Sequence, residues 1–148
     1  VVVSPDVGSV ARARTFAQKL GLPLAIVDKR RQKANSSEVM NIIGNVKGKK
    51  VILLDDMVDT AGSLCHAAQA IVDIGGATEV YACASHGVLS GPSYDRIEQS
   101  PIKELVLLDS IPAQRENFPK IKYLTVADLF AEAIERIYQE VSVSKLFN

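Results

Sequence analysis

The sequence alternates short apolar runs with segments whose apolar residues recur every three or four positions, and this alternation limits the folds that the chain can adopt. The runs are rich in β-branched residues, as expected of strands. The intervening segments have the periodicity of amphipathic helices, most clearly over residues 126–138. The pattern predicts an α/β layered domain. The apolar runs are Val1–Ser4, Pro23–Asp28, Lys50–Asp56, Glu79–Ser85, Glu104–Ser110 and Ile121–Thr125.

The predicted strands are nearly continuous in their apolar character, which indicates burial on both faces. Such strands are typical of parallel sheets covered by helices. We therefore expect a mainly parallel sheet of about five strands with helices on both faces, forming one domain over residues 1–148. Ligands of such domains bind beyond the carboxyl ends of the strands, so the residues after each run are the candidate site residues.

Charge and composition argue against several classes of partner. The 17 basic and 17 acidic residues cancel, so no overall field attracts the chain to nucleic acid or to an anionic membrane. No apolar run reaches the roughly 20 residues that cross a bilayer, and no secretory leader is visible. Two cysteines, Cys65 and Cys83, favour buried, reduced thiols and a cytoplasmic location. The opening VVVSPD has a strand pattern without an initiator Met, and we expect a fragment of a longer polypeptide.

The stretch VILLDDMVDTAGS, residues 51–63, places acids and a small-residue turn at the end of an apolar run. Adjacent strand residues face opposite ways, so Asp55 and Asp56 can reach one ligand only if the strand ends there. Residues 59–63 supply that ending, and the helical pattern begins directly after them. Backbone N–H groups in such a turn and at a helix N-terminus suit a phosphate. The candidate residues are Asp55, Asp56, Asp59, Thr60, Ala61, Gly62 and Ser63.

Two interpretations of this acid turn stay open on the residues alone. In the simpler one, Asp59 or Thr60 caps the helix and the two preceding acids are solvated. In the other, the carboxylates accept hydrogen bonds from sugar hydroxyls or hold a magnesium ion, while backbone amides hold a phosphate of the same sugar. A phosphorylated pentose would satisfy both halves of such a site.

The same stretch resembles the ribose-5-phosphate loop of the type I phosphoribosyltransferase fold, in which two adjacent acids follow an apolar strand and precede a small-residue phosphate turn. The variant DTAGS is similar to that of the ribose-phosphate pyrophosphokinase family, also called the phosphoribosyl diphosphate synthetases. The resemblance extends over essentially the whole chain. It implies transfer of the diphosphoryl group of ATP to ribose 5-phosphate, with Mg²⁺ as cofactor and release of AMP.

Basic residues follow the second run in the stretch DKRRQKANSS. By themselves they fit a solvated loop, although a cationic loop beyond a buried strand could also close over a site and neutralise phosphates. The stretch resembles the catalytic flexible loop of the synthetase family. By position Lys29 matches its catalytic lysine and Arg31 its substrate-contacting arginine. Residues 38–44 have an ambiguous local pattern, for which the family implies a strand.

The opening SPDVG places Asp6 between the first run and the first helical segment. On the residues alone Asp6 is a turn or cap residue. The stretch resembles the family pattern Ser-Pro-Asp-x-Gly, which implies that Asp6 binds magnesium at the nucleotide phosphates. Arg12 and Arg14 continue this motif but lie on different faces of the predicted helix, so at most one of them faces the site.

The final VSVSKLFN follows the last predicted helix. Its simplest interpretation is a frayed end whose Leu146 and Phe147 pack back on the core. It is also similar to the Ser-Val-Ser-x-Leu-Phe end of the synthetase family, which contributes to an allosteric anion and nucleotide site between subunits. The regulatory candidates are therefore Ser142, Val143, Ser144 and Phe147.

Enzymes of this family have two similar α/β halves, and the chain resembles the C-terminal one. The resemblance implies as partners ATP, ribose 5-phosphate, the missing N-terminal half and further subunits of a homo-oligomer, a hexamer in the family. Because the missing half carries most of the adenine pocket, we expect the chain alone to be inactive. Two alternatives remain: a phosphoribosyltransferase that uses phosphoribosyl diphosphate and a nucleobase, and a non-catalytic regulatory subunit associated with the synthetase.

Overall fold

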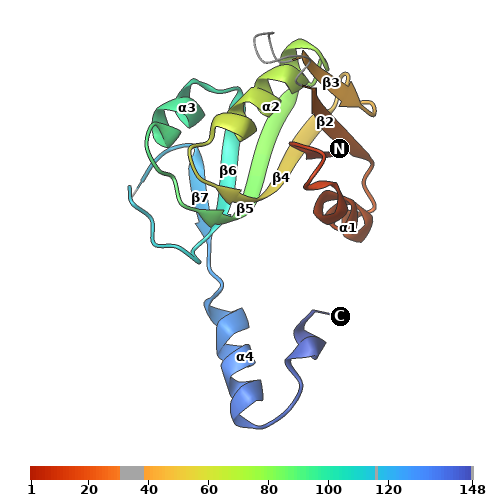
Figure 1. Cartoon of the computed structure of the whole chain (residues 1–148). Helices are drawn as coiled ribbons and strands as arrows, with labels where there is room; N and C mark the ends of the chain where they lie inside the picture. Colours follow the sequence, from red (N-terminus) through yellow and green to blue (C-terminus); the bar gives the residue numbers. More distant parts are fainter. Residues whose placement is uncertain (31–38, 116, 148) are drawn as a thin grey trace.

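Within residues 1–30, 39–115 and 117–147, which the computed structural model describes, seven strands form one sheet (Figure 1). Their order across the sheet is β3-β2-β1-β4-β5-β6-β7. Only β3 runs antiparallel to its neighbour, while the other neighbouring pairs of this sheet are parallel. The strands are β1 (Val2–Ser4), β2 (Leu24–Arg30), β3 (Val39–Ile43), β4 (Lys50–Val58), β5 (Glu79–Gly87), β6 (Ile102–Leu108) and β7 (Ile121–Leu124).

The predicted α/β class and mainly parallel sheet are confirmed, but the expected number of about five strands is too low. Six of the seven strands correspond to the six apolar runs, β7 to the run Ile121–Thr125, and the seventh is β3, where the resemblance implied a strand. The segment that forms β3 has an ambiguous local pattern and becomes a strand by pairing with β2, with Lys29 opposite Met40. At the other edge β7 is only four residues long.

Helices cover both faces of the sheet, as predicted. On one face α1 (Val10–Leu20) packs against β1, β2 and β4, and Gly21 ends the helix in the left-handed conformation with φ of 62°. The other face is covered by α2 (Gly62–Asp73) and α3 (Ser93–Gln99). The main core lies between this second face and its two helices, where Ile71 and Leu105 are fully buried.

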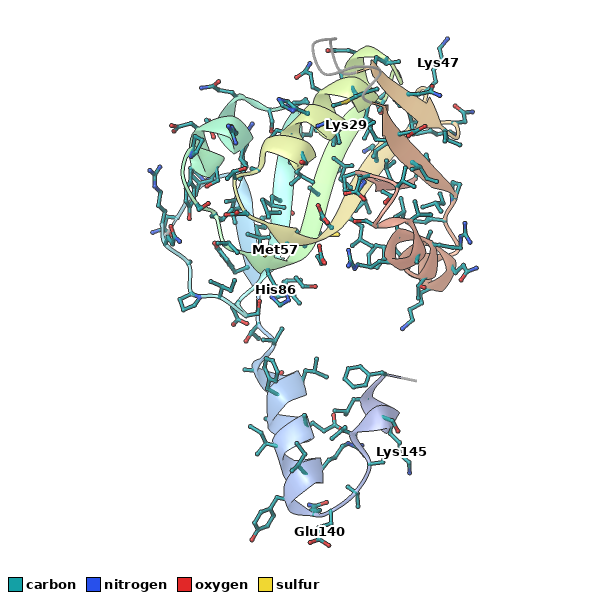
Figure 2. All side chains as sticks on the ribbon, viewed as in Figure 1. Lys29, Lys47, Met57, His86, Glu140 and Lys145 are labelled. Carbon is teal, nitrogen blue, oxygen red and sulfur yellow. The ribbon has the colours of Figure 1, made fainter. Side chains whose placement is uncertain are left out.

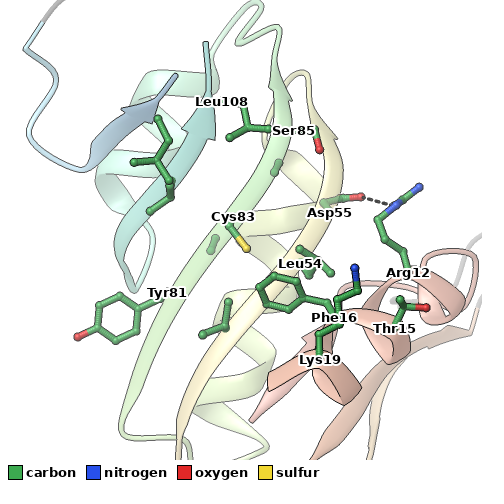
Figure 3. Close-up of a pocket in the computed structure, with 15 residues that line it drawn as sticks. Arg12, Thr15, Phe16, Lys19, Leu54, Asp55, Tyr81, Cys83, Ser85 and Leu108 are labelled. Carbon is green, nitrogen blue, oxygen red and sulfur yellow. Dashed lines mark ion pairs between the residues drawn. The ribbon is translucent and has the colours of Figure 1, made fainter. Parts of the chain in front are cut away.

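The opposite face of β4, β5 and β6 is only half-buried. Leu54, Tyr81, Cys83 and Val106 point to this side and, with Phe16 of α1, line an apolar groove of about 850 Å³ (Figure 3). Burial alternates along β5 and β6, with fully buried positions under α2 and α3 only. The expectation of burial on both faces is therefore wrong for these two strands, because no helix in the described part of the chain covers this region.

The last helix, α4 (Ala127–Tyr138), extends away from the sheet together with the 3₁₀ helix η1 (Val143–Leu146) (Figures 1 and 2). It has the predicted amphipathic pattern, and the Thr125 hydroxyl accepts a hydrogen bond from the Ala127 N–H at its start. Just before the helix, the Asp109 carboxylate accepts a hydrogen bond from the Val126 N–H at 2.8 Å. Because α4 extends away from the sheet, its apolar side chains are exposed, and Ile134 is 66% exposed.

The expectation that the final residues pack back on the core is wrong. Phe147 is 67% exposed, and η1 contacts α4 rather than the sheet. None of the helices in the described ranges is both long and apolar enough to cross a membrane.

Candidate functional site

The candidate site lies where the strand order reverses. From β1 the chain moves to β2 on one side of the sheet, whereas β4 leads to β5 on the other side, and β1 and β4 are neighbours. Loops from such neighbouring strands diverge, which leaves a crevice beyond their carboxyl ends. Asp6 follows β1, and the pair Asp55 and Asp56 belongs to the last part of β4. The topology thus brings these three acids to one edge.

From the sequence we expected the strand to end at the acid pair. In the structure β4 continues to Val58. Asp55 and Asp56 are nevertheless both reached from one side by Arg12 of α1. The Arg12 guanidinium lies 2.8 Å from the Asp56 carboxylate and 3.9 Å from that of Asp55 (Figure 3). Arg12 is thus the arginine of its motif that faces the acids, and one group can engage both carboxylates.

The two neighbouring carboxyl groups have opposite pKa shifts. Burial raises the pKa of Asp55 to about 6, and the negative charges of Asp56 and Asp6 act in the same direction. For Asp56, desolvation acts to raise the pKa, but a hydrogen bond with Asp55, the charge of Arg12 and backbone N–H groups together outweigh it and lower the pKa. Asp56 is therefore the more firmly ionised member of the pair.

The turn after β4, residues 59–63, leads directly into α2, as predicted. Ala61 is the residue before the helix and has a left-handed backbone with φ of 58°. Within these described residues no side chain makes a capping hydrogen bond to the start of α2, so the interpretation of Asp59 or Thr60 as the helix cap is wrong. The first N–H groups of α2 are thus left without a side-chain cap, and such N–H groups can donate hydrogen bonds to an anion.

Contacts from the segment after β5 hold this turn. The hydroxyl of Ser90 donates to the Asp59 carboxylate, and the Arg96 guanidinium of α3 donates to the Thr60 carbonyl at 2.9 Å. The sequence analysis missed both partners. The available signal was their position in and after SHGVLSG, the segment that follows a predicted strand and therefore lies at the same edge.

Asp6 makes the local contact expected of a cap residue. Its carboxylate accepts from the Ser9 N–H at 2.7 Å, just before α1 begins. The described residues contain no group of three or more His, Cys, Asp or Glu side chains arranged to hold a metal. A magnesium site here would therefore be of the kind that uses one or two carboxylates and completes its shell with phosphate and water oxygens. The oxygen donors fit that kind of site, and the assignment of Asp6 to magnesium stays a prediction.

The two basic candidates differ in what is known of their position. Lys29 lies at the carboxyl end of β2, and its side chain is exposed (Figure 2). It is three residues beyond Ile26, which pairs with Ser4 at the end of β1. Arg31 lies outside the described residues. The contribution of both to the site stays a prediction.

The fold and the site together define a doubly wound α/β domain with an acid pair and an uncapped phosphate-type turn at the reversal of strand order. Orotate phosphoribosyltransferase from Aeropyrum pernix has this fold: it matches 90% of the chain with a TM-score of 0.59 and 15% identity, a likeness of fold alone. The class is thus the phosphoribosyltransferase-like α/β fold, as the resemblance implied.

Residues 30–148 match the model of a family described as the phosphoribosyl synthetase-associated domain, and the chain belongs to this family. It is 65% identical over 148 residues to the ribose-phosphate pyrophosphokinase of Caldanaerobacter subterraneus subsp. tengcongensis, covering 99% of this chain and 46% of that protein. The solved phosphoribosylpyrophosphate synthetase of Mycobacterium smegmatis matches with a TM-score of 0.84 at 35% identity, over 94% of this chain and 45% of that one. The chain thus spans about half the length of these relatives.

Proposed function

We propose that this chain is the C-terminal half of a cytoplasmic ribose-phosphate pyrophosphokinase, which transfers the diphosphoryl group of ATP to the anomeric hydroxyl of ribose 5-phosphate and releases AMP. The observation that carries the proposal is the uncapped turn at the start of α2 beside an acid pair with opposite pKa shifts. The names of the relatives support the same reaction for the longer protein.

In this proposal the turn holds the 5-phosphate. Backbone N–H groups of Ala61, Gly62 and Ser63 donate to phosphate oxygens, and the positive end of the α2 dipole favours the charge. The hydroxyls of Thr60 and Ser63 are exposed and add donors. The turn therefore recognises a phosphate without an obligatory cationic side chain.

The acid pair holds the ribose hydroxyls. Asp56 is ionised and exposed, and it accepts a hydrogen bond from a sugar hydroxyl. Asp55, with a pKa of about 6, is mostly ionised at neutral pH and accepts from the next hydroxyl. Arg12 stays beside both carboxylates and offsets their repulsion. The sugar is thereby fixed at both ends, which orients its anomeric oxygen for attack.

Transfer of a diphosphoryl group asks the protein mainly for positioning and charge stabilisation. Magnesium, when bound near Asp6, supplies positive charge at the ATP phosphates. Lys29 and Arg31 stabilise the charge that develops on the migrating group. This division places binding of the sugar on β4 and α2, and stabilisation of the diphosphoryl group on the segments that follow β1 and β2.

The longer protein also supplies partners in this proposal. The relatives are about twice as long as the chain, which supports a missing half that completes the nucleotide pocket. The exposed apolar side of α4 provides a surface for contacts between the two halves or between subunits of a homo-oligomer. At the end of the chain the Ser142 and Ser144 hydroxyls lie 2.7 Å apart. These serines, with Val143 and Phe147, are proposed to take part in regulation.

Calorimetry with the chain tests the binding half of the proposal. Ribose 5-phosphate should release heat on binding, ribose should not, and Thr60→Trp should abolish the signal because the indole fills the turn. Thr78→Trp, at the opposite end of β5, is the matched control and should bind like the wild type. The proposal is wrong if ribose 5-phosphate gives no heat or if Thr60→Trp leaves binding unchanged.

A coupled assay of AMP release tests the catalytic half. The chain alone should show no turnover, and co-expression with the remaining half of the enzyme should produce it. Heat released on adding a nucleobase together with phosphoribosyl diphosphate, in place of ATP, would instead favour the phosphoribosyltransferase alternative.

A further inference from the structure

The phosphate turn has a backbone conformation that needs support from outside the turn. Ala61 is in the left-handed region with φ of 58°, which is unfavourable for a residue with a Cβ atom. No side chain in the described turn caps the helix that follows. A turn of this kind keeps one shape only if neighbouring segments hold it.

A main-chain ladder supplies the first support. Pairing between β4 and β5 ends with Val58 opposite Gly87, but two further hydrogen bonds continue it: the Leu89 N–H donates to the Val58 carbonyl and the Ser90 N–H to the Asp59 carbonyl, each at 3.1 Å. Leu89 is 2% exposed, so this segment is anchored in the core. The ladder ties the first residue of the turn to a buried point.

Side chains supply the second support. The Ser90 hydroxyl donates to the Asp59 carboxylate. The carboxylate thus has a partner other than the backbone N–H groups of the turn, and these N–H groups stay available to a phosphate. The Arg96 guanidinium donates to the Thr60 carbonyl at 2.9 Å. A Cβ atom added at Gly62 would lie 3.3 Å from Arg96 Nη1, so the small residue at this position gives the guanidinium room.

The contact of Arg96 has a consequence for the next amide. In a trans peptide the carbonyl and the following N–H point in opposite directions. Because the Thr60 carbonyl points to Arg96 on α3, the Ala61 N–H points away from α3. Arg96 therefore sets the direction of a backbone donor without touching the ligand itself.

We propose that Arg96 and Ser90 are positioning residues that hold the phosphate turn, and the Ala61 N–H above all, in its binding conformation before ribose 5-phosphate arrives. This inference rests on the proposed function and deepens it. Preorganised donors cost no reordering when the anion binds, so loss of either residue weakens phosphate binding.

Hydrogen exchange in the ligand-free chain tests the positioning by itself. In Arg96→Gln, exchange at the amides of Ser90 and Cys65, whose N–H groups donate to the Asp59 and Ala61 carbonyls of the turn, should be about fivefold faster than in the wild type, as expected when a hydrogen bond worth about 1 kcal/mol is lost. Arg96→Lys should restore part of the protection. Arg115→Gln removes a guanidinium that lies over Tyr94 of the same helix and should leave these amides unchanged.

Affinity for ribose 5-phosphate, measured by calorimetry, tests the consequence. Arg96→Gln and Ser90→Ala should each weaken binding about five- to tenfold, whereas Arg115→Gln should bind like the wild type. Wild-type exchange and affinity in both Arg96→Gln and Ser90→Ala would overturn the inference. If the wild type itself fails to bind the sugar phosphate, the proposed function fails, while the exchange data still decide whether Arg96 holds the turn.

Discussion

Arg12 on α1 donates a hydrogen bond of 2.8 Å to Asp56 on β4, 44 residues away in the sequence. The contact joins the helix that follows β1 to the last part of β4, and it brings a positive charge to the acid pair at the point where the strand order reverses. The electrostatics of the candidate site therefore depend on a helix that contributes no residue to the phosphate turn.

Replacing Arg12 by Gln should raise the pKa of Asp56, because the guanidinium is one of the groups that lower it. Carboxyl-detected NMR titration in the presence of EDTA measures this shift. The free energy of unfolding should change by less than about 1 kcal/mol, since the pair is partly exposed. Arg14→Gln removes an exposed positive charge of the same helix and should leave the Asp56 titration unchanged. An unchanged pKa in Arg12→Gln would show that the ion pair does not persist in solution.

The chain should lose stability as pH rises from about 4 to above 6. Asp55 has a folded pKa of about 6 and an ordinary value of 3.8, so the folded state binds this proton more tightly than the unfolded state. Its favourable contribution is complete below the unfolded pKa and is lost as pH rises through the folded one. The two values correspond to a loss of up to about 3 kcal/mol.

Urea unfolding across this pH range measures the effect. Asp55→Asn should flatten the profile and be more stable than the wild type at pH 7, because the neutral amide avoids the buried charge. Asp73→Asn, at the exposed end of α2, should keep the wild-type pH profile. A wild-type slope that survives in Asp55→Asn would assign the pH dependence to another group.

Ile134→Ala in α4 should lower the free energy of unfolding by less than about 0.5 kcal/mol, because the side chain is 66% exposed. Ile71→Ala in α2 is the matched substitution at a fully buried site and should cost about 2–5 kcal/mol. Denaturant unfolding of both variants provides the comparison. A large loss in Ile134→Ala would show that α4 packs against another surface in solution.

The Cys83 thiol should react slowly with disulfide reagents. Burial raises its pKa to about 11, so only a small fraction is thiolate at pH 8, and the rate should be about two orders of magnitude below that of an ordinary thiol with a pKa near 8.5. In a Cys65→Ala background, which isolates this thiol, the rate should rise about tenfold per pH unit from pH 8 to 10. A rate that levels off near pH 9 would contradict the raised pKa.

Several features could be predicted from the sequence because they depend on neighbouring residues. The apolar period over residues 126–138 predicts a helix, and α4 spans Ala127–Tyr138. The small residues after Asp59 predict a turn that leads into a helix, and α2 begins at Gly62. Periodicity and turn chemistry act over a few residues, so they can be identified without knowing the fold.

Other features required the arrangement of distant segments. The contact between Arg96 and Thr60 joins residues 36 positions apart, and no local pattern distinguishes Arg96 from other exposed basic residues. The half-buried face of β5 was also misjudged, because an apolar run does not show whether a helix covers both of its sides.

The sequence by itself determined the α/β class, the acid pair and the turn before α2, since each depends on residue types at short spacing. Only the tertiary structure decided that Arg12 would engage both acids, that Arg96 and Ser90 would hold the turn, and that α4 would leave one side of β5 and β6 without a covering helix. These outcomes depend on which strands pair and on how helices lie across them, and the free energies that select such pairings come from contacts between residues far apart in the chain.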